Sequence, residues 1–187
     1  MDAQKIRARA RARLRPLPPP LPREEGLRAA AVLMPLLPVE GALHLLFTVR
    51  PAGMPTHAGE ICFPGGRLKA GEDALRAALR EAHEEVGIAP HMVEPLGFGD
   101  ARRTGSGHVI APLLGLVRRE CTISPCPREV AEVFTAPLAH FLNAENYSRE
   151  EMLVRGQRRQ YWVVRWRRRR IWGATAAILW RLRERLS

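Results

Sequence analysis

Residues 73–86 are the part of this sequence that most restricts its fold. They contain no glycine or proline, and alanine, leucine, arginine and glutamate dominate them, so they predict a helix. Asp73 stands where an aspartate caps a helix start, and Gly87 stands where a helix ends. Apolar residues recur there at helical spacing and predict the face that packs on a sheet: Leu75, Leu79, Ala82 and Val86.

The other side of this predicted helix gathers three carboxylates. Glu84 and Glu85 lie three and four residues after Glu81, so all three project from one side. Like charges at this spacing destabilise an isolated helix. A bound divalent cation would remove the repulsion, because Mg²⁺ and Mn²⁺ take carboxylate, carbonyl and water oxygens. The alternative is a solvated acidic stripe, compensated in part by Arg76 and Arg80.

A glycine pair precedes the helix and favours a ligand site over the stripe. Gly65 and Gly66 let the backbone approach a ligand closely. Metal beside such a turn suits phosphate substrates, because cations bridge and neutralise phosphate oxygens. The formal net charge of +11 also suits an anion: a phosphorylated small molecule, nucleic acid or an acidic membrane surface. A solvated basic coat explains the charge equally well.

The rest of the domain is predicted to form strands followed by further helices. Apolar runs at 29–38 and 42–50 flank a Glu-Gly turn and predict paired strands, and a short strand is expected at 61–63. Further buried strands are expected from Val93, at 108–117, before a helix near Pro137, and at 160–166. The segment 171–186 predicts a closing amphipathic helix. This order, without a repeat, predicts a mixed α/β sandwich.

We divide the chain into a basic, proline-rich tail and linker at 1–25 and one domain at 26–187. The first part is expected to be a mobile basic helix or tail, because 15–23 is proline-rich and cannot continue a helix. Its start lacks the apolar core of a secretory signal; a mitochondrial transit segment is less favoured, because it has no serine. No apolar run reaches the length of a membrane span. Three cysteines without a CxxC pattern predict a reduced, cytoplasmic compartment.

The region around the predicted helix resembles the Nudix box. Every fixed glycine, glutamate and arginine of that motif is present, and the one soft departure is Ala82, where a larger aliphatic residue is usual. The resemblance implies an α/β fold, the Nudix-type α/β/α sandwich around a mixed β-sheet, with the box forming a loop, a helix and a loop. The matching positions are Gly66, Glu72, Arg80, Glu81, Glu84, Glu85, Gly87 and Ile88.

The resemblance implies that Glu81, Glu84 and Glu85 are ligands of Mg²⁺ or Mn²⁺, often joined by the Gly66 carbonyl. It implies that Glu72 and Arg80 form a structural ion pair, from which Arg80 can orient Glu81. In this superfamily water attacks a phosphorus of a nucleoside diphosphate that is linked to a second moiety.

The catalytic base differs between Nudix families. It is either a box glutamate such as Glu81 or a distal carboxylate. Glu129 matches the position where a distal carboxylate recurs, and Glu132 is the neighbouring alternative. An ordinary surface residue on a strand is an equally good interpretation of Glu129.

The residues before the box resemble the signature that coenzyme A pyrophosphatases carry. The segments at 107–117, 129–142 and 171–179 resemble the same family, so the likeness runs from about Ala29 to the last helix. Two departures are Pro51-Ala52, where small or hydroxyl residues are usual, and Pro55, where a basic residue is usual. The signature includes Leu45 and Thr48, and it implies these substrate-binding residues: Arg50, His57, Gly59, Phe63 and Gly65.

The leading hypothesis is metal-dependent hydrolysis of the diphosphate of coenzyme A or an acyl-CoA, giving 3′,5′-ADP and a 4′-phosphopantetheine product. The alternative is a Nudix hydrolase of another nucleoside diphosphate derivative, such as ADP-ribose or NADH. A basic nucleic-acid-binding protein is disfavoured because no aromatic-basic RNA motif occurs. A silent, ligand-sensing module is disfavoured because every box acid is intact. The expected partner is a small molecule, and a homodimer is compatible with the sequence.

Coenzyme A is polyanionic, with a diphosphate and a separate 3′-phosphate, so basic side chains near the site would favour it. Tryptophans near the C-terminus either stack on adenine or belong to the core. The basic candidates are Arg50, Arg67, Lys69, Arg102 and Arg103, and the aromatic ones are Trp162, Trp166 and Trp172.

Overall fold

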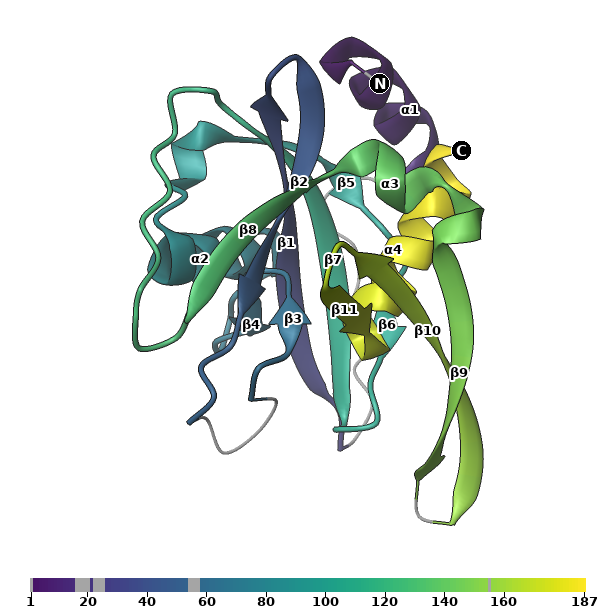
Figure 1. Ribbon diagram of the computed structural model, residues 1–187. Helices are drawn as coiled ribbons and strands as arrows, with labels where there is room; N and C mark the ends of the chain where they lie inside the picture. The colour runs from purple at the N-terminus through teal and green to yellow at the C-terminus, as the bar shows by residue number, and fades with distance from the viewer. Residues whose placement is uncertain (1, 16–20, 22–25, 54–57, 155) are drawn as a thin grey trace.

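A mixed eight-stranded sheet forms the centre of the computed structural model, which describes residues 2–15, 21, 26–53, 58–154 and 156–187 (Figure 1). Its strands are β1 (Arg28–Val39), β2 (Ala42–Val49), β3 (Ile61–Cys62), β4 (Gly65–Arg67), β5 (Val93–Phe98), β6 (Arg102–Arg103), β7 (His108–Val117) and β8 (Glu132–Pro137). The main path is β3-β2-β1-β7-β5, with β4 beside β1, β6 beside β7 and β8 beside β2. Strands β1 and β7 are parallel and the other neighbours antiparallel.

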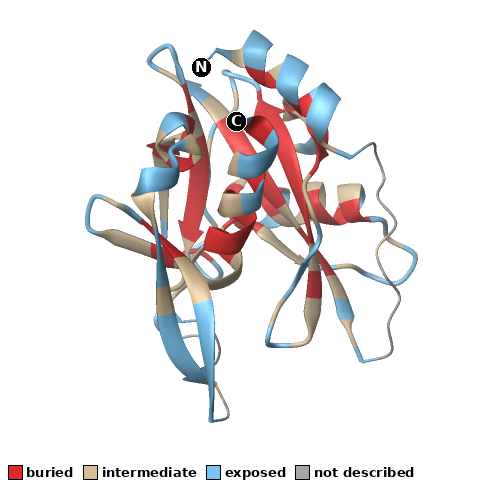
Figure 2. Cartoon of the chain, turned by 90° about the vertical axis from the view of Figure 1, so that its right-hand side faces the viewer, coloured by how far each residue is buried: buried red, intermediate tan, exposed pale blue. Residues whose placement is uncertain are grey.

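Helices cover both faces of this sheet, which confirms the predicted α/β/α sandwich. They are α1 (Ala3–Arg13), α2 (Ala74–Val86), α3 (Leu138–Leu142) and α4 (Gly173–Leu186), with 3₁₀ turns η1 (Pro90–Met92) and η2 (Ala144–Asn146). Helix α2 packs on one face, where Leu33 and Val86 share a core, and the other three helices lie on the opposite side, where Leu36 and Leu179 share a second core. Figure 2 shows the buried sheet between exposed outer surfaces.

Helix α2 begins and ends where the sequence predicts. The Asp73 side chain accepts a hydrogen bond from the Arg76 amide at 2.8 Å, and Gly87 ends the helix with φ +75°. The buried face differs in part from the prediction, because Leu75 and Leu79 are only partly buried at its edges. Small residues instead face the sheet and let the helix approach it closely: Ala74, Ala77, Ala78 and Ala82.

A second, three-stranded sheet was only partly expected. Its strands are β9 (Tyr147–Val154), β10 (Gln157–Trp166) and β11 (Arg169–Trp172), in the order β11-β10-β9. Strands β9 and β10 form a long hairpin that reaches away from the body of the molecule (Figure 1). The sequence did not predict β9 because most of it is exposed on both sides, so it lacks the apolar alternation of a half-buried strand.

The N-terminal segment is helical but does not behave as the mobile tail that we expected. Helix α1 packs beside α4 and β5, and Ile6 and Ala10 are completely buried in the core. Arg7 forms an ion pair with Glu94 at 2.7 Å. The proposed boundary between residues 25 and 26 stays a prediction, because 16–20 and 22–25 lie outside the described residues, as does most of the proline-rich link.

Replacing Ile6 by alanine should lower the free energy of unfolding by about 2–4 kcal/mol, because it leaves a cavity in a fully buried position. Urea denaturation followed by circular dichroism measures the change. Gln4→Ala is the matched control, because Gln4 is exposed on the same helix. Equal midpoints for the two variants would contradict the packing of α1 on the domain.

The three cysteines, Cys62, Cys121 and Cys126, are free thiols. Across the described ranges, no helix has both the length and the apolar character needed to cross a membrane.

Candidate active site

Arg80 ties the loop after β4 to helix α2. Its Nε and Nη2 donate to the two carboxylate oxygens of Glu72 at 2.8 and 2.9 Å, and Nη2 also donates to the Arg67 carbonyl at 3.2 Å. Its Nη1 donates to Glu81 at 2.8 Å and to Glu84 at 2.9 Å. Hydrogen bonding to the Arg80 guanidinium lowers the pKa of Glu72 to about 2. Arg80 therefore fixes the loop and orients two helix carboxylates.

The two glycines of β4 lie in close contact with different neighbours. A Cβ on Gly66 would lie 2.5 Å from the Glu81 carboxylate, so only glycine leaves room for that side chain. A Cβ on Gly65 would lie 2.4 Å from the Ala31 carbonyl oxygen, where β4 pairs with β1. The Gly66 backbone therefore lies directly beside the Glu81 carboxylate, the kind of close approach that the glycine pair predicts.

Glu85 is a buried carboxylate with acidic neighbours. Its exposed fraction is 6%, and the Gly65 amide donates to it at 3.3 Å. Burial, and then the charges of Glu81 and Glu129, raise the pKa of Glu85 to about 8. Carboxylate oxygens such as those of Glu81 and Glu85 are the ligands that a hard divalent cation prefers.

Glu84 lies differently from its two partners in the predicted ligand set. Its side chain is 48% exposed and is bound by Arg80 and, at 3.8 Å, by Lys69. Within the described part of the chain, no three histidine, cysteine or acidic side chains converge as ligands around one point. Glu81 and the adjacent Gly66 backbone supply the kind of oxygen atoms that a divalent cation binds. Glu84 also carries such oxygens, but Arg80 and Lys69 hold its carboxylate.

The two candidate distal carboxylates have different surroundings. Glu129 is exposed in a turn before β8, not on a strand, and it interacts electrostatically with Glu85. The loop that carries it is joined to the end of α2, since the Cys126 amide donates to the Glu85 carbonyl at 2.9 Å. Glu132 is bound at both carboxylate oxygens by Arg169, at 2.5 and 3.0 Å. Glu129 is therefore the better placed of the two.

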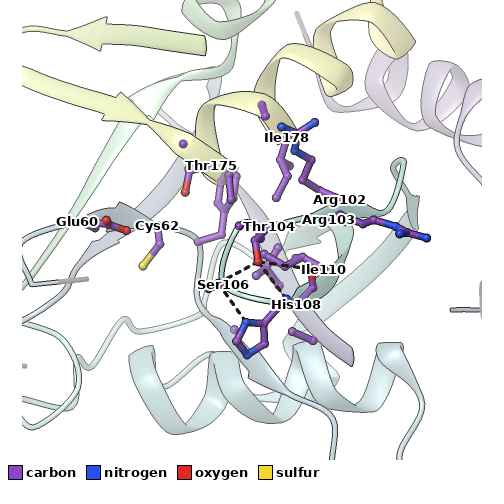
Figure 3. Close-up of a pocket in the computed structure, with 18 of the residues that line it drawn as sticks. Glu60, Cys62, Arg102, Arg103, Thr104, Ser106, His108, Ile110, Thr175 and Ile178 are labelled. Carbon is purple, nitrogen blue, oxygen red and sulfur yellow. Dashed lines mark hydrogen bonds between the residues drawn. The ribbon is translucent and has the colours of Figure 1, made fainter. Parts of the chain in front are cut away.

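A cavity of about 960 Å³ opens beside the glycine pair (Figure 3). Gly65 and Gly66 form part of its wall, and the Glu81 carboxylate of α2 lies directly beside Gly66. Among its described lining residues six are arginines, and Glu60 is the one acid. These arginines are Arg28, Arg50, Arg67, Arg102, Arg103 and Arg149. Such a lining favours a polyanionic ligand.

The structure brings most of the predicted substrate-binding residues to this cavity. Arg50, Phe63 and Gly65 line it, and the buried Phe63 ring stacks on Phe47 at 4.9 Å. Gly59 lies outside the lining, in an exposed turn with φ +69°. His57 is outside the described residues.

Some of the other basic and aromatic residues proposed from the sequence line the cavity, and others do not. Trp172 lines the cavity, as do Arg67, Arg102 and Arg103, but Lys69 does not. Trp166 packs against His140 at 4.8 Å, as the core alternative predicts. Trp162 lines the cavity, but Trp180 stacks on its ring at 3.8 Å and the Arg149 guanidinium covers it at 4.5 Å. Its ring faces are therefore not open to adenine.

Sequence reasoning missed several lining residues on the second sheet and helix α4. Arg149, Gln160 and Tyr161 come from the β9–β10 hairpin, and Thr175 comes from the first turn of α4. The one available signal was Gly156, which has φ +77° and marks the hairpin turn.

Comparison with known proteins identifies the family of the chain. The NUDIX domain family model matches residues 27–161. The uncharacterized Nudix hydrolase NudL of Photorhabdus laumondii is 34% identical over 161 residues, which cover 86% of each chain. NudL of Enterobacter sp. is 36% identical over 153 residues, covering 81% of this chain and 79% of the relative.

Two solved structures show the same fold at low sequence identity. RenU, a Nudix hydrolase from M. smegmatis, is 22% identical with a TM-score of 0.53, covering 63% of this chain and 74% of that one. An Ap4A hydrolase of C. elegans is 20% identical with a TM-score of 0.52, covering 59% and 80%. At these identities the likeness is one of fold alone.

Proposed function

Because the chain belongs to the Nudix family of hydrolases, which act on nucleoside diphosphate derivatives, we propose that it hydrolyses the diphosphate of coenzyme A or an acyl-CoA. The products are 3′,5′-ADP and a 4′-phosphopantetheine or its acyl form. The observation that carries the proposal is the arginine-lined cavity, whose wall includes both the box glycine Gly66 and the upstream residues Arg50, Phe63 and Gly65. The segment that resembles coenzyme A pyrophosphatases and the glycine of the box thus border the same cavity.

Arg50 supports an anionic ligand most directly. Its Nε is buried and has no hydrogen-bond partner within the described residues, although the side chain lines the cavity. A buried donor without a partner costs about 1–3 kcal/mol. A phosphate oxygen of the substrate would satisfy it with a charge-assisted hydrogen bond.

The proposed metal ligands are Glu81, Glu84, Glu85 and the Gly66 carbonyl, for either Mg²⁺ or Mn²⁺. The chemistry that such a cation supplies when bound is neutralisation of phosphate charge and a more acidic attacking water. The protein holds the carboxylates in place. Arg80 is anchored by its hydrogen bond to Glu72, and it donates a second hydrogen bond that positions Glu81.

The reaction needs one proton acceptor near the attacking water. The water oxygen bonds to a phosphorus, the bridging P–O bond breaks, and the water proton passes to a carboxylate and then to solvent. Glu129 suits this role because it is exposed and not held by an arginine in the described structure, whereas Arg80 binds Glu81 at 2.8 Å. A carboxylate that no guanidinium occupies is open to a hydrogen bond from the attacking water.

Glu129→Gln should lower kcat by about 10²–10⁴-fold and leave KM nearly unchanged, since it removes a base but no substrate contact. Glu132→Gln is the matched control, because it removes a neighbouring carboxylate that binds Arg169 instead. Steady-state kinetics on coenzyme A measures both variants. Equal rates for wild type and Glu129→Gln would transfer the role of base to Glu81.

The substrate assignment is tested by a panel of coenzyme A, acetyl-CoA, ADP-ribose and NADH at equal concentrations with Mn²⁺ or Mg²⁺. We expect kcat/KM for the coenzyme A compounds to exceed the other two by at least about tenfold, the effect of one or two added charge-assisted contacts. Turnover of ADP-ribose or NADH at an equal or higher kcat/KM would keep the family chemistry and overturn the coenzyme A assignment.

A further inference from the structure

We propose that the first turn of α4, together with Arg102 and Arg149, forms a second anion subsite that binds a substrate phosphate other than those being hydrolysed. The inference rests on the proposed function and deepens it, because the 3′-phosphate of coenzyme A is such a group. The subsite lies in the same cavity as Gly65 and Gly66 but is built from different elements.

Helix α4 presents an uncapped N-terminus to the cavity. Trp172 precedes the helix without a side-chain cap, and Gly173, Ala174 and Thr175 of the first turn line the cavity. A Cβ on Gly173 would meet no atom within 4 Å, so space is open in front of the turn. Free amides and the helix dipole together attract an anion at such an end.

Thr175 is an independent sign of a ligand at this place. The residue is only 8% exposed, yet within the described structure its hydroxyl makes no hydrogen bond. Figure 3 shows the hydroxyl at the cavity wall, on the turn that leads to Ile178. The hydroxyl borders the cavity, so a bound group can reach it. A phosphate oxygen there would accept a hydrogen bond from Thr175.

Two arginines flank this turn, and neither has a carboxylate partner in the described part of the molecule. In Figure 3 Arg102 points toward Ile178 of α4. Arg149 is held in place, since it covers the Trp162 ring at 4.5 Å and donates to Gln160 at 3.3 Å. Both guanidinium groups are thus available to an anion.

Two arginines of the same small sheet that lie outside the cavity share one carboxylate partner instead. Arg165 and Arg170 both bind Glu150, at 2.9 and 2.5 Å. Within the described residues, Arg102 and Arg149 lack the carboxylate partner that Arg165 and Arg170 have. A charge left unpaired beside a cavity favours binding of an anionic group there.

Strand register separates this subsite from the glycine pair. Arg67, Ala30, Ile110 and Arg102 stand side by side on β4, β1, β7 and β6. Three strand spacings put the backbones of Arg67 and Arg102 about 14 Å apart. Long arginine side chains shorten the gap, so one nucleotide-sized ligand can contact both ends of the cavity.

Isothermal titration calorimetry with 3′,5′-ADP and 5′-AMP tests the subsite, because the two differ only in the 3′-phosphate and neither is hydrolysed. We expect wild type to bind 3′,5′-ADP at least about tenfold more tightly than AMP. Arg102→Ala, Arg149→Ala and the isosteric Thr175→Val should each reduce this preference several-fold and leave AMP binding nearly unchanged.

Arg158→Ala is the matched control, since Arg158 lies on the same hairpin, outside the cavity lining, beside Glu151 at 3.7 Å. It changes net charge equally and should keep the full preference. Equal affinity of wild type for both nucleotides, or an equal loss in the control, would overturn the proposal.

A kinetic comparison of coenzyme A with 3′-dephospho-CoA separates this inference from the proposed function. If the subsite acts in catalysis, Arg102→Ala raises KM for coenzyme A and leaves KM for 3′-dephospho-CoA unchanged. If wild type cleaves neither compound, the proposed function fails, while calorimetry still decides the subsite.

Discussion

Replacing Glu85 by glutamine is expected to lower hydrolysis by more than about 100-fold, beyond what loss of an outer partner of a metal ligand typically costs. The same change should stabilise the metal-free protein. Glu85 is 6% exposed, and the negative charges of Glu81 and Glu129 each act on it more strongly than the positive charge of Arg50. Glutamine keeps the shape and the acceptor for the Gly65 amide but removes the buried charge, whose release is worth on the order of 2 kcal/mol.

The stabilisation should depend on pH. Burial raises the folded-state pKa of Glu85 from 4.5 to about 8, so the folded protein binds an extra proton between those values. Wild type without metal therefore loses stability as pH rises from 4.5 through 8, and the glutamine variant escapes that loss. Thermal unfolding in EDTA at pH 5 and pH 8 should show a small difference at the lower pH and a large one at the higher.

Glu84→Gln is the matched control for stability, because Glu84 is half exposed and paired with Arg80. It should lower activity without stabilising the metal-free protein. A Glu85→Gln variant that melts at the wild-type temperature at pH 8 would contradict the account of Glu85 as a buried, uncompensated charge.

Gly66→Ala should lower activity but spare the fold, whereas Gly65→Ala should lower the stability of the fold. The alanine at 66 meets the Glu81 carboxylate at 2.5 Å, and this flexible group can move aside. The fold is expected to survive while Glu81 leaves its place beside Arg80, which should lower kcat by about 100-fold or more. The alanine at 65 meets the fixed Ala31 carbonyl at 2.4 Å, so β4 must separate from β1 at a cost of about 1–3 kcal/mol or more.

Parallel measurement of melting temperature and kcat for both variants separates the two effects. The account predicts a near-normal melting temperature with little activity for Gly66→Ala, and a clearly lowered melting temperature for Gly65→Ala. Full activity of Gly66→Ala would show that Glu81 does not need its present position.

Local signals predicted the region around α2 well. Asp73 and Gly87 mark where the helix begins and ends, and the acid spacing identifies the side that carries Glu81 and Glu85. The sandwich followed from the order of apolar runs. The hydrophobic pattern was less informative about which residues of α2 are buried. The helix contacts the sheet mainly through alanines, and their low hydrophobicity gives only a weak signal in the sequence.

Contacts between residues far apart in the sequence were harder to predict from it. Ile6 is one apolar residue among arginines, so its burial against residues far along the chain could not be predicted from periodicity. Strand β9 is mostly exposed, and its Arg149 reaches the cavity because β10, with which β9 pairs, packs beside α4. Glu84 shares the helical spacing of the other acids, yet Arg80 and Lys69 hold it to one side.

The most direct test of the central claim is chromatography of purified protein incubated with coenzyme A and Mn²⁺ or Mg²⁺. The account predicts loss of coenzyme A and appearance of 3′,5′-ADP and 4′-phosphopantetheine in equal amounts, with both products absent in EDTA and in the Glu85→Gln variant. Intact coenzyme A under all metal conditions, beside hydrolysis of ADP-ribose or NADH by the same sample, would contradict it.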